Sequence, residues 1–205
     1  IISYSFSFTE PWLGGRKPNA LTLSFFQSFM SNWQSKTSEN YGWFRRTGVS
    51  AGLGRRLTWP DDYFSIYQGI NVMRYNLMKY STQYLNVGDG NGKFNIISYN
   101  IVLSRNSVSQ PIYPRNGSEF QISLELTPPY SLFTHKDYST MSENEKYKWV
   151  EMHRWNFKAV WYTELYEKLV MMTRVRFGYL GHYNDQIGPT PFHRYYLGGD
   201  GINTS

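Results

Sequence analysis

The fold is decided by the opening stretch of the chain, Ile2-Ser3-Tyr4-Ser5-Phe6-Ser7-Phe8-Thr9. Apolar and hydroxyl side chains alternate through it, and a period of two residues places successive side chains on opposite faces of a β-strand. One face of this strand is therefore apolar, whereas the other carries only serine and threonine. Such a strand is typical of a membrane β-barrel, which faces lipid outside and water or polar side chains inside.

The alternation returns in segment after segment. Leu21 and Leu23 alternate with Thr22 and Ser24, and the pattern recurs at 120–127. We predict eight strands, at 1–9, 20–30, 46–58, 64–77, 94–105, 118–127, 154–163 and 168–180. The phase of the fourth strand stays open, because two apolar sets compete for its outward face: Ile66, Ile70 and Val72, or Tyr67, Met73 and Tyr75.

The links between these strands alternate in length. Short or turn-rich links lie at 10–19, 59–63, 106–117 and 164–167, and longer ones at 31–45, 78–93, 128–153 and after 180. An antiparallel barrel produces this alternation when one rim faces the periplasm and the other the cell exterior. We therefore predict an integral protein of a Gram-negative outer membrane with its long loops extracellular.

Aromatic residues gather near the ends of the predicted strands. Two girdles at the membrane interfaces would explain them: Trp12, Trp59, Tyr63, Phe64, Tyr113 and Tyr166 near the short links, and Trp33, Trp43, Phe44, Trp155 and Tyr179 near the long ones. One alternative is that they are ordinary core aromatics of a soluble β protein. Another is a soluble β-sandwich that binds carbohydrate through its aromatics.

Composition narrows the class of protein. The 205 residues are 40% hydrophobic and 19% aromatic, include no cysteine, and carry a net charge of +6. No apolar run approaches the roughly 18 to 20 residues that a membrane-spanning helix needs. The basic residues are dispersed, so we expect no nucleic-acid partner.

Five basic residues fall in phase with small or polar ones on the predicted inward face: Arg56, Arg154, Lys158, Arg174 and Arg176. Unpaired charges in a dry core would cost several kcal/mol each, whereas a wet lumen tolerates them. Two roles are open for these lumen-facing charges. They solvate the interior, which we favour, or they pair with an acidic loop or plug.

Motifs for catalysis, cofactors and metals are missing from the sequence. No zinc-protease, dinucleotide or serine-hydrolase motif is present, and the four histidines lack metal-ligand spacing. We therefore expect no catalytic, cofactor-binding or metal-binding residues and no enzyme activity. The stretch 139–153 predicts a short helix on a long loop, capped at Ser139 or Ser142.

Two motifs resemble one known family. The stretch 111–120, with the turn residues Pro114, Asn116 and Gly117, resembles a periplasmic turn of BamA-type outer-membrane assembly barrels. The stretch 193–199 is similar to the segment that leads into the sixth extracellular loop of that family, and its root residues would be Tyr195, Tyr196, Gly198 and Gly199. The resemblance covers essentially the whole chain.

The resemblance implies a fold and a function. Residues 1–205 would be part of one transmembrane barrel domain, about strands four to eleven of sixteen together with the start of loop six. The family's Val-Arg-Gly-Phe/Tyr signature does not follow Gly199. The POTRA repeats and the terminal gate strands are also absent, so we expect a central fragment of the barrel.

A barrel of this family inserts other β-barrel proteins into the outer membrane. Its partners would be the lipid bilayer, unfolded outer-membrane clients and accessory subunits of an assembly complex. Three alternatives stay open besides the sandwich: a two-partner-secretion or TamA-like translocation barrel, a porin, and a small outer-membrane barrel enzyme.

Overall fold

A computed structural model of the chain describes residues 1–15, 19–32, 34–80, 87, 89–134 and 136–195. Its strands are β1 (Ile2–Glu10), β2 (Asn19–Ser31), β3 (Trp43–Arg56), β4 (Phe64–Met78), β5 (Gly92–Asn106), β6 (Gly117–Leu126), β7 (His153–Tyr166) and β8 (Leu169–Gly181). The prediction of eight strands is confirmed, and β3 begins three residues earlier than expected. The short helices are η1 (Leu13–Gly15), α1 (Tyr130–Thr134) and α2 (Glu143–Lys146).

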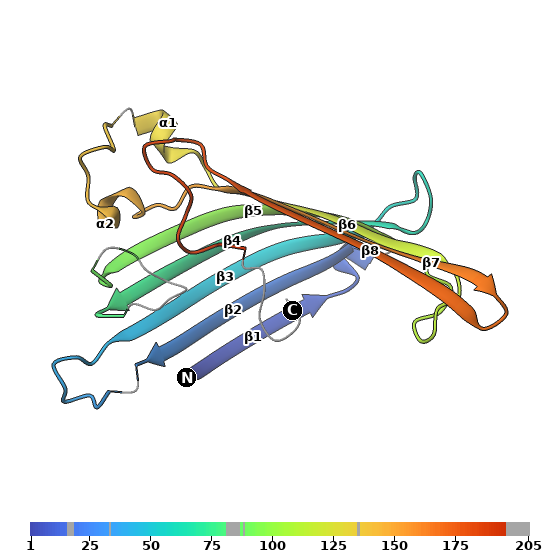
Figure 1. Cartoon of the computed structure of the whole chain (residues 1–205), viewed down its shortest axis with the longest axis horizontal. Coiled ribbons are helices and arrows are strands. Elements are labelled where there is room, and N and C mark those ends of the chain that lie inside the picture. The colour runs from blue at the N-terminus through green and yellow to red at the C-terminus, as the bar shows by residue number, and fades with distance from the viewer. Residues whose placement is uncertain (16–18, 33, 81–86, 88, 135, 196–205) are drawn as a thin grey trace.

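The eight strands form one antiparallel sheet in chain order, from β1 to β8 (Figure 1). Each strand pairs with the next along the chain, as short links between antiparallel strands require. This all-β meander confirms the predicted antiparallel sheet of eight strands. None of the helices in the described residues has the length and apolar content needed to cross a membrane.

The register sorts the side chains into two faces. One row across five strands holds Phe6, Phe25, Val49, Val72 and Ile97, and we name the face that contains it the outer face. The adjacent row, on the inner face, holds Ser7, Ser24, Ser50, Asn71 and Ser98. Apolar side chains of the outer face stay exposed, as in Phe6 at 67% and Phe177 at 61%.

The register also settles the phase of β4. Ile70 and Val72 lie on the outer face beside Ala51 and Val49. Tyr67 lies on the inner face, where a Cβ at Gly52 would come within 2.1 Å of its hydroxyl oxygen. Gly52 therefore makes room for the inward ring of Tyr67. This explains why apolar side chains occur on both the outer and the inner face of β4.

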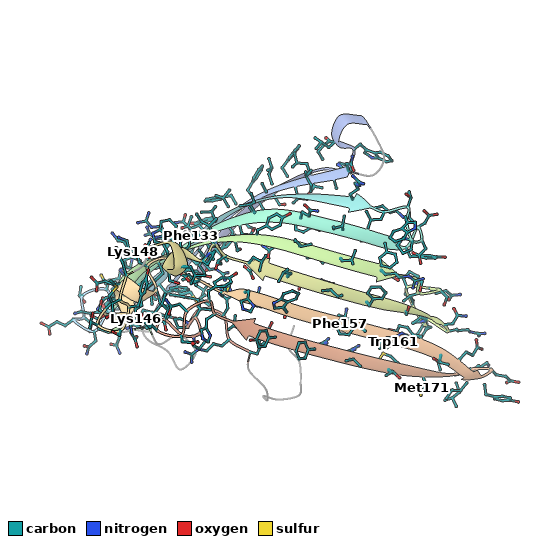
Figure 2. All side chains as sticks on the ribbon, turned by 90° about the horizontal axis from the view of Figure 1, so that it is seen from above. Phe133, Lys146, Lys148, Phe157, Trp161 and Met171 are labelled. Carbon is teal, nitrogen blue, oxygen red and sulfur yellow. The ribbon has the colours of Figure 1, made fainter. Side chains whose placement is uncertain are left out.

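Short and long links lie at opposite ends of the sheet (Figure 1). The short ones are 11–18, 57–63, 107–116 and 167–168, and the long ones are 32–42, 79–91 and 127–152. Link 107–116 is nearly as long as 32–42, but it continues the hairpin, because the Ser109 amide donates to the Asn116 carbonyl at 3.1 Å. Figure 2 places Phe133, Lys146 and Lys148 at the end with the long links and Met171 near the other end.

One member of the expected girdles lies elsewhere. Phe44 is on the inner face and buried, and its ring stacks on Tyr75 at 5.8 Å and on Tyr80 at 5.7 Å. It belongs to a core cluster beneath the long links rather than to the lipid interface. Trp33, a second expected member, lies outside the described residues.

The long link 127–152 carries both α-helices. The predicted helix forms only over Glu143–Lys146, after the N-cap residue Ser142, whose amide donates to the Glu145 carboxylate at 3.3 Å. It ends early because the next residues turn to β5, where the Asn95 amide donates to the Lys148 carbonyl at 2.9 Å. Helix α1 was not anticipated from the sequence.

Candidate functional site

The candidate site is the inner face together with the segment that follows β8. This segment, residues 182–195, is named the return segment, because it leaves β8 at the long-link end and runs back across the sheet (Figure 1). Two hydrogen bonds join the return segment to link 127–152. The Tyr147 hydroxyl donates to the Ile187 carbonyl at 3.0 Å, and the Tyr138 amide donates to the Gln186 side chain at 3.1 Å.

Aromatic contacts fix the return segment to the inner face. The ring of Phe192 lies 4.9 Å from that of Tyr75 on β4 and 4.9 Å from that of Phe94 on β5. Phe94 is fully buried and Tyr75 is 6% exposed, so this contact closes the core cluster. Aromatic pairs at such distances add stabilisation beyond the apolar area that they bury.

Tyr195 holds the far end of the segment. Its hydroxyl donates to the Trp155 carbonyl at 3.2 Å and to the Asn156 side-chain oxygen. Its ring lies over Gly178 on β8, where an added Cβ would meet the ring at 2.7 Å. A close approach of this kind needs glycine.

The other predicted root residues lie beyond the described part of the chain. Tyr196, Gly198 and Gly199 fall within residues 196–205, which are outside the described residues. Their role in loop six stays a prediction. The described part brings the chain to Tyr195 on the inner face.

The five predicted lumen charges all occupy inner-face positions in the register. Arg154 pairs with Glu125 at 2.6 Å, and Lys158 pairs with Glu119 at 3.0 Å, so both partners lie on the neighbouring strand β6. Arg56 donates through Nε to the Asp62 carbonyl at 2.6 Å. Arg174 and Arg176 lie on β8 opposite Val160 and Lys158.

The pairing of Arg154 and Lys158 differs from both roles that we expected for the lumen-facing charges. The charges are paired, but their partners are strand carboxylates rather than an acidic loop. Glu125 and Glu119 occupy the polar positions that alternate with apolar ones along β6. That alternation was the signal in the sequence that could have identified them.

His193 lies in the middle of this charged region. Burial lowers the pKa of His193 from its usual 6.5 to about 4, Glu125 opposes the shift, and Arg154 and Arg46 add to it. In the described residues, Nδ1 of His193 and Nε of Arg154 are buried without a hydrogen-bond partner. The return segment therefore docks with a neutral imidazole beside a half-buried ion pair.

The predicted periplasmic turn forms a second polar cluster at the short-link end. Gly117 has a φ of 104°, and an added Cβ would come within 2.3 Å of the Ser107 carbonyl oxygen. Asn116 pairs with Ser109 across the hairpin, and Pro114 lies in the tip of the turn between them.

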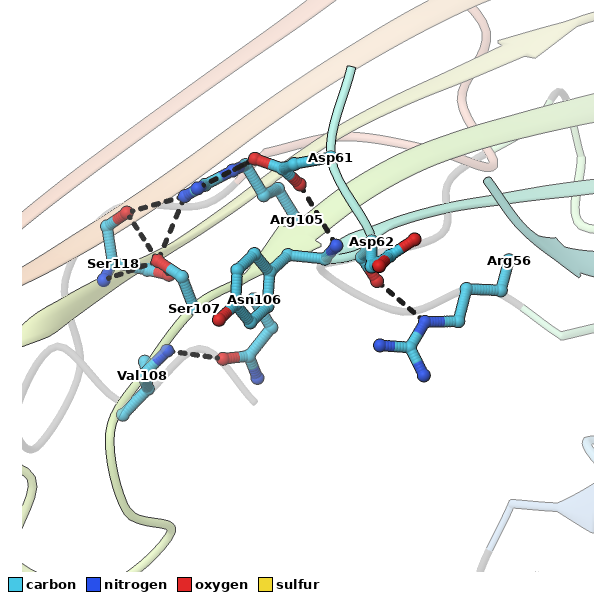
Figure 3. Close-up of polar contacts among 9 residues, drawn as sticks. Arg56, Asp61, Asp62, Arg105, Asn106, Ser107, Val108 and Ser118 are labelled. Atoms are coloured by element: carbon cyan, nitrogen blue, oxygen red, sulfur yellow. Dashed lines mark hydrogen bonds and ion pairs between the residues drawn. The ribbon is translucent and has the colours of Figure 1, made fainter. Parts of the chain in front are cut away.

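Arg105 joins this turn to its neighbour. Its guanidinium pairs with Asp61 in link 57–63 at 2.9 Å and donates to Ser107 at 2.9 Å and Ser118 at 3.3 Å (Figure 3). Neither Arg105 nor Asp61 stands out in the sequence as a site residue. Each lies where a strand meets a short link, but the contact depends on which links are neighbours in space.

Chemistry of the catalytic kind has little support in the geometry. Within the described residues, no group of three or more metal-ligating side chains comes together. His182 lies 2.9 Å from Asp185, and that carboxylate is fully exposed on the return segment. The inner face does hold a segment of chain, because Phe192 and Tyr195 of the return segment contact it.

Comparison with known proteins identifies the family. The model of the Omp85 superfamily domain matches residues 2–202. The chain belongs to the Omp85 superfamily. Membership of this superfamily makes the chain part of an integral barrel of the bacterial outer membrane.

A solved structure has the same fold. The crystal structure of BamA from Haemophilus ducreyi lacking POTRA domains 1–3 superposes with a TM-score of 0.67 at 19% sequence identity. The match covers 97% of this chain and 36% of that one, so the chain spans about a third of the BamA chain. The predicted resemblance to BamA-type barrels is confirmed. No curated protein matches the chain.

Proposed function

We propose that the full-length protein assembles and inserts other β-barrel proteins into the bacterial outer membrane. The observation that carries the proposal is the return segment, which Phe192 and Tyr195 fix to the inner face of an Omp85 barrel wall. A barrel that must stay in shape while its wall opens gains an internal brace.

The proposed mechanism is templating by backbone hydrogen bonds. A strand in lipid cannot leave its N–H and C=O groups unpaired, so an incoming client strand is stabilised by pairing with an exposed strand edge. The wall from β1 to β8 would hold that edge in shape. Tyr195, followed by Tyr196, Gly198 and Gly199, would direct loop six into the lumen.

The same proposal gives the protein an orientation and partners. The links 32–42, 79–91 and 127–152 would lie outside the cell, the turn around Asn116 would face the periplasm, and clients and accessory subunits would approach from there. Cysteines at Ser35, Gly90 and Ser142 should react with an impermeant reagent on intact cells. Cysteines at Asp61 and Asn116 should react only after the outer membrane is opened, and a mixed result within either group would contradict the orientation.

The function can be tested by displacing the return segment. Gly178→Val places side-chain atoms where the Tyr195 ring lies, so the segment should dock poorly while the outer wall still forms. We expect the levels of many unrelated outer-membrane barrels to fall together, with envelope stress. Gly199→Val, chosen from the sequence motif, should act in the same way.

Ser7→Val is the matched control, since Ser7 lies on the inner face of β1 opposite Ser24, far along the sheet from β8. It should leave barrel levels near normal. Normal levels of every other barrel in a Gly178→Val strain that makes the damaged protein would contradict the assembly function. Loss of one secreted substrate alone would favour a translocation barrel of the TamA or two-partner-secretion type.

A further inference from the structure

Three basic side chains gather on the outer face at the long-link end of the sheet. Arg45 on β3, Arg74 on β4 and Lys93 on β5 are all exposed. They stand out because the rest of the outer face toward the middle of the strands is apolar, with Val49, Val72 and Ile97 among its residues.

The register brings these three cations together. Arg45 and Lys93 both lie opposite Asn76 on β4, one on each side, and Arg74 is the next outer-face residue along that strand. Diagonal neighbours of this kind lie about 7–8 Å apart. We call Arg45, Arg74 and Lys93 the outer-face cation cluster.

No carboxylate neutralises the cluster in the described part of the chain. The residues between the cations are Thr47, Asn76 and Asn95, and none of the ion pairs formed there includes a member of the cluster. Arg105, on the outer face at the opposite end, is instead paired with Asp61 at 2.9 Å. Three like charges side by side without a counter-ion repel one another, so an anionic partner would be stabilised there.

Aromatic rings beside the cluster indicate its depth in the membrane. The Arg45 guanidinium lies 5.4 Å from the Trp43 ring centroid and 5.9 Å from that of Phe29. Tryptophan and other aromatic side chains mark the membrane interface of outer-membrane barrels. The cations therefore lie at headgroup depth, directly beside an apolar surface on which acyl chains can pack.

We propose that the outer-face cation cluster binds the phosphate groups of a bisphosphorylated glycolipid of the surrounding leaflet. Three cations spread over three strands at about 4.8 Å per strand span more than one phosphate group, which favours a lipid with two. Arginine binds phosphate through paired N–H donors, and lysine acts as a point charge. The acyl chains would lie along Val49, Val72 and Ile97.

The choice of a glycolipid rests on the proposed orientation, because the outer leaflet of a Gram-negative outer membrane is built from phosphorylated glycolipid. The inference does not depend on insertase activity. Lipid retention is measured without a client, so failure of one proposal is distinguishable from failure of the other.

The test is native mass spectrometry of the full-length protein released from phosphatidylcholine nanodiscs that contain diphosphoryl lipid A. The unmodified protein should retain lipid A. Arg45→Gln, Arg74→Gln and Lys93→Gln should each lower the affinity by about fivefold, the loss that corresponds to about 1 kcal/mol per cation. Monophosphoryl lipid A should be retained less than the diphosphoryl form.

Arg55→Gln is the matched control, because Arg55 is an exposed outer-face arginine at the short-link end, opposite Asn19 and Ile66. It should leave lipid A retention unchanged. The proposal is overturned if the unmodified protein retains no lipid A, if the three single variants, each checked for a folded barrel, retain it as well as the unmodified protein, or if Arg55→Gln loses it equally. In nanodiscs that contain equal amounts of cardiolipin and lipid A, preferential retention of cardiolipin would also overturn it.

Discussion

The two faces of the sheet are built from the same strands, but the outer face exposes apolar side chains whereas the inner face pairs polar ones. On the outer face, Phe6 and Val49 belong to a continuous exposed apolar row. On the inner face, Ser24 shares a hydrogen bond with Ser50, and Ser65 with Ser104 at 2.8 Å. The contrast teaches that this sheet is turned inside out relative to a water-soluble protein, with lipid as the solvent of one face.

The faces also differ in what they hold. The inner face carries paired charges and the return segment, and its small residues leave room for inward rings such as Tyr67 and Tyr195. The outer face offers apolar area in the middle and cations at the rim. Function that depends on a docked segment therefore belongs to the inner face, and lipid contact belongs to the outer face.

The largest expected effect comes from placing charge on the outer face. Leu23→Arg, Ile122→Arg or Leu124→Arg should each destabilise the barrel by about 2–4 kcal/mol, because the guanidinium would lie near the middle of the bilayer. Ser24→Arg and Ser123→Arg, one residue away on the inner face, should be much milder. Unfolding of the reconstituted barrel in denaturant measures the difference, and equal damage on both faces would contradict their assignment.

A smaller effect is expected from acid on the inner face. A free His193 takes up a proton below its usual pKa of 6.5, whereas the docked side chain resists protonation down to about 4. Docking is therefore fully stable above 6.5 and is weakened as the pH falls toward 4, by about 2 kcal/mol at about pH 5.

Protease cleavage within the return segment measures this loss of docking. Cleavage should speed up as the pH is lowered, with a pH-independent protease activity as reference. His193→Gln should remove most of the dependence while leaving the segment docked near neutral pH. Cleavage that does not change with pH in the unmodified protein would contradict the buried neutral state of His193.

The smallest expected effect comes from one hydroxyl. Tyr195→Phe removes the hydrogen bonds to Trp155 and Asn156 but keeps the ring over Gly178, so docking should weaken by about 1 kcal/mol. Hydrogen exchange in the return segment should rise. Tyr4→Phe, an exposed outer-face change, serves as the control and should have no effect there.

Most of the fold could be predicted from the sequence, because a period of two is a local property. The alternation around Phe6 and Ile122 identified the strands and their faces without knowledge of any neighbour. The phase of β4 could not be predicted, since the rings of Tyr67 and Tyr75 are inward only because Gly52 and the return segment make an inner environment for them.

The candidate site was less accessible to sequence reasoning. The inward phase of Arg154 followed from alternation, but its pairing with Glu125 depends on the register between β6 and β7. Phe44 was misassigned to an aromatic girdle, because position near a strand end does not say which face a ring occupies. The contacts of Phe192 and His193 arise from the path of a loop, which no periodicity encodes.

The most direct test of the central claim is a folding assay with purified components. The full-length protein, reconstituted in phospholipid vesicles, should accelerate the membrane insertion of several unrelated unfolded β-barrels. Gly178→Val should remove most of that acceleration, whereas Ser7→Val should keep it. Equal insertion rates in vesicles with the unmodified protein, with Gly178→Val and with no protein at all would contradict an assembly function that depends on the docked return segment.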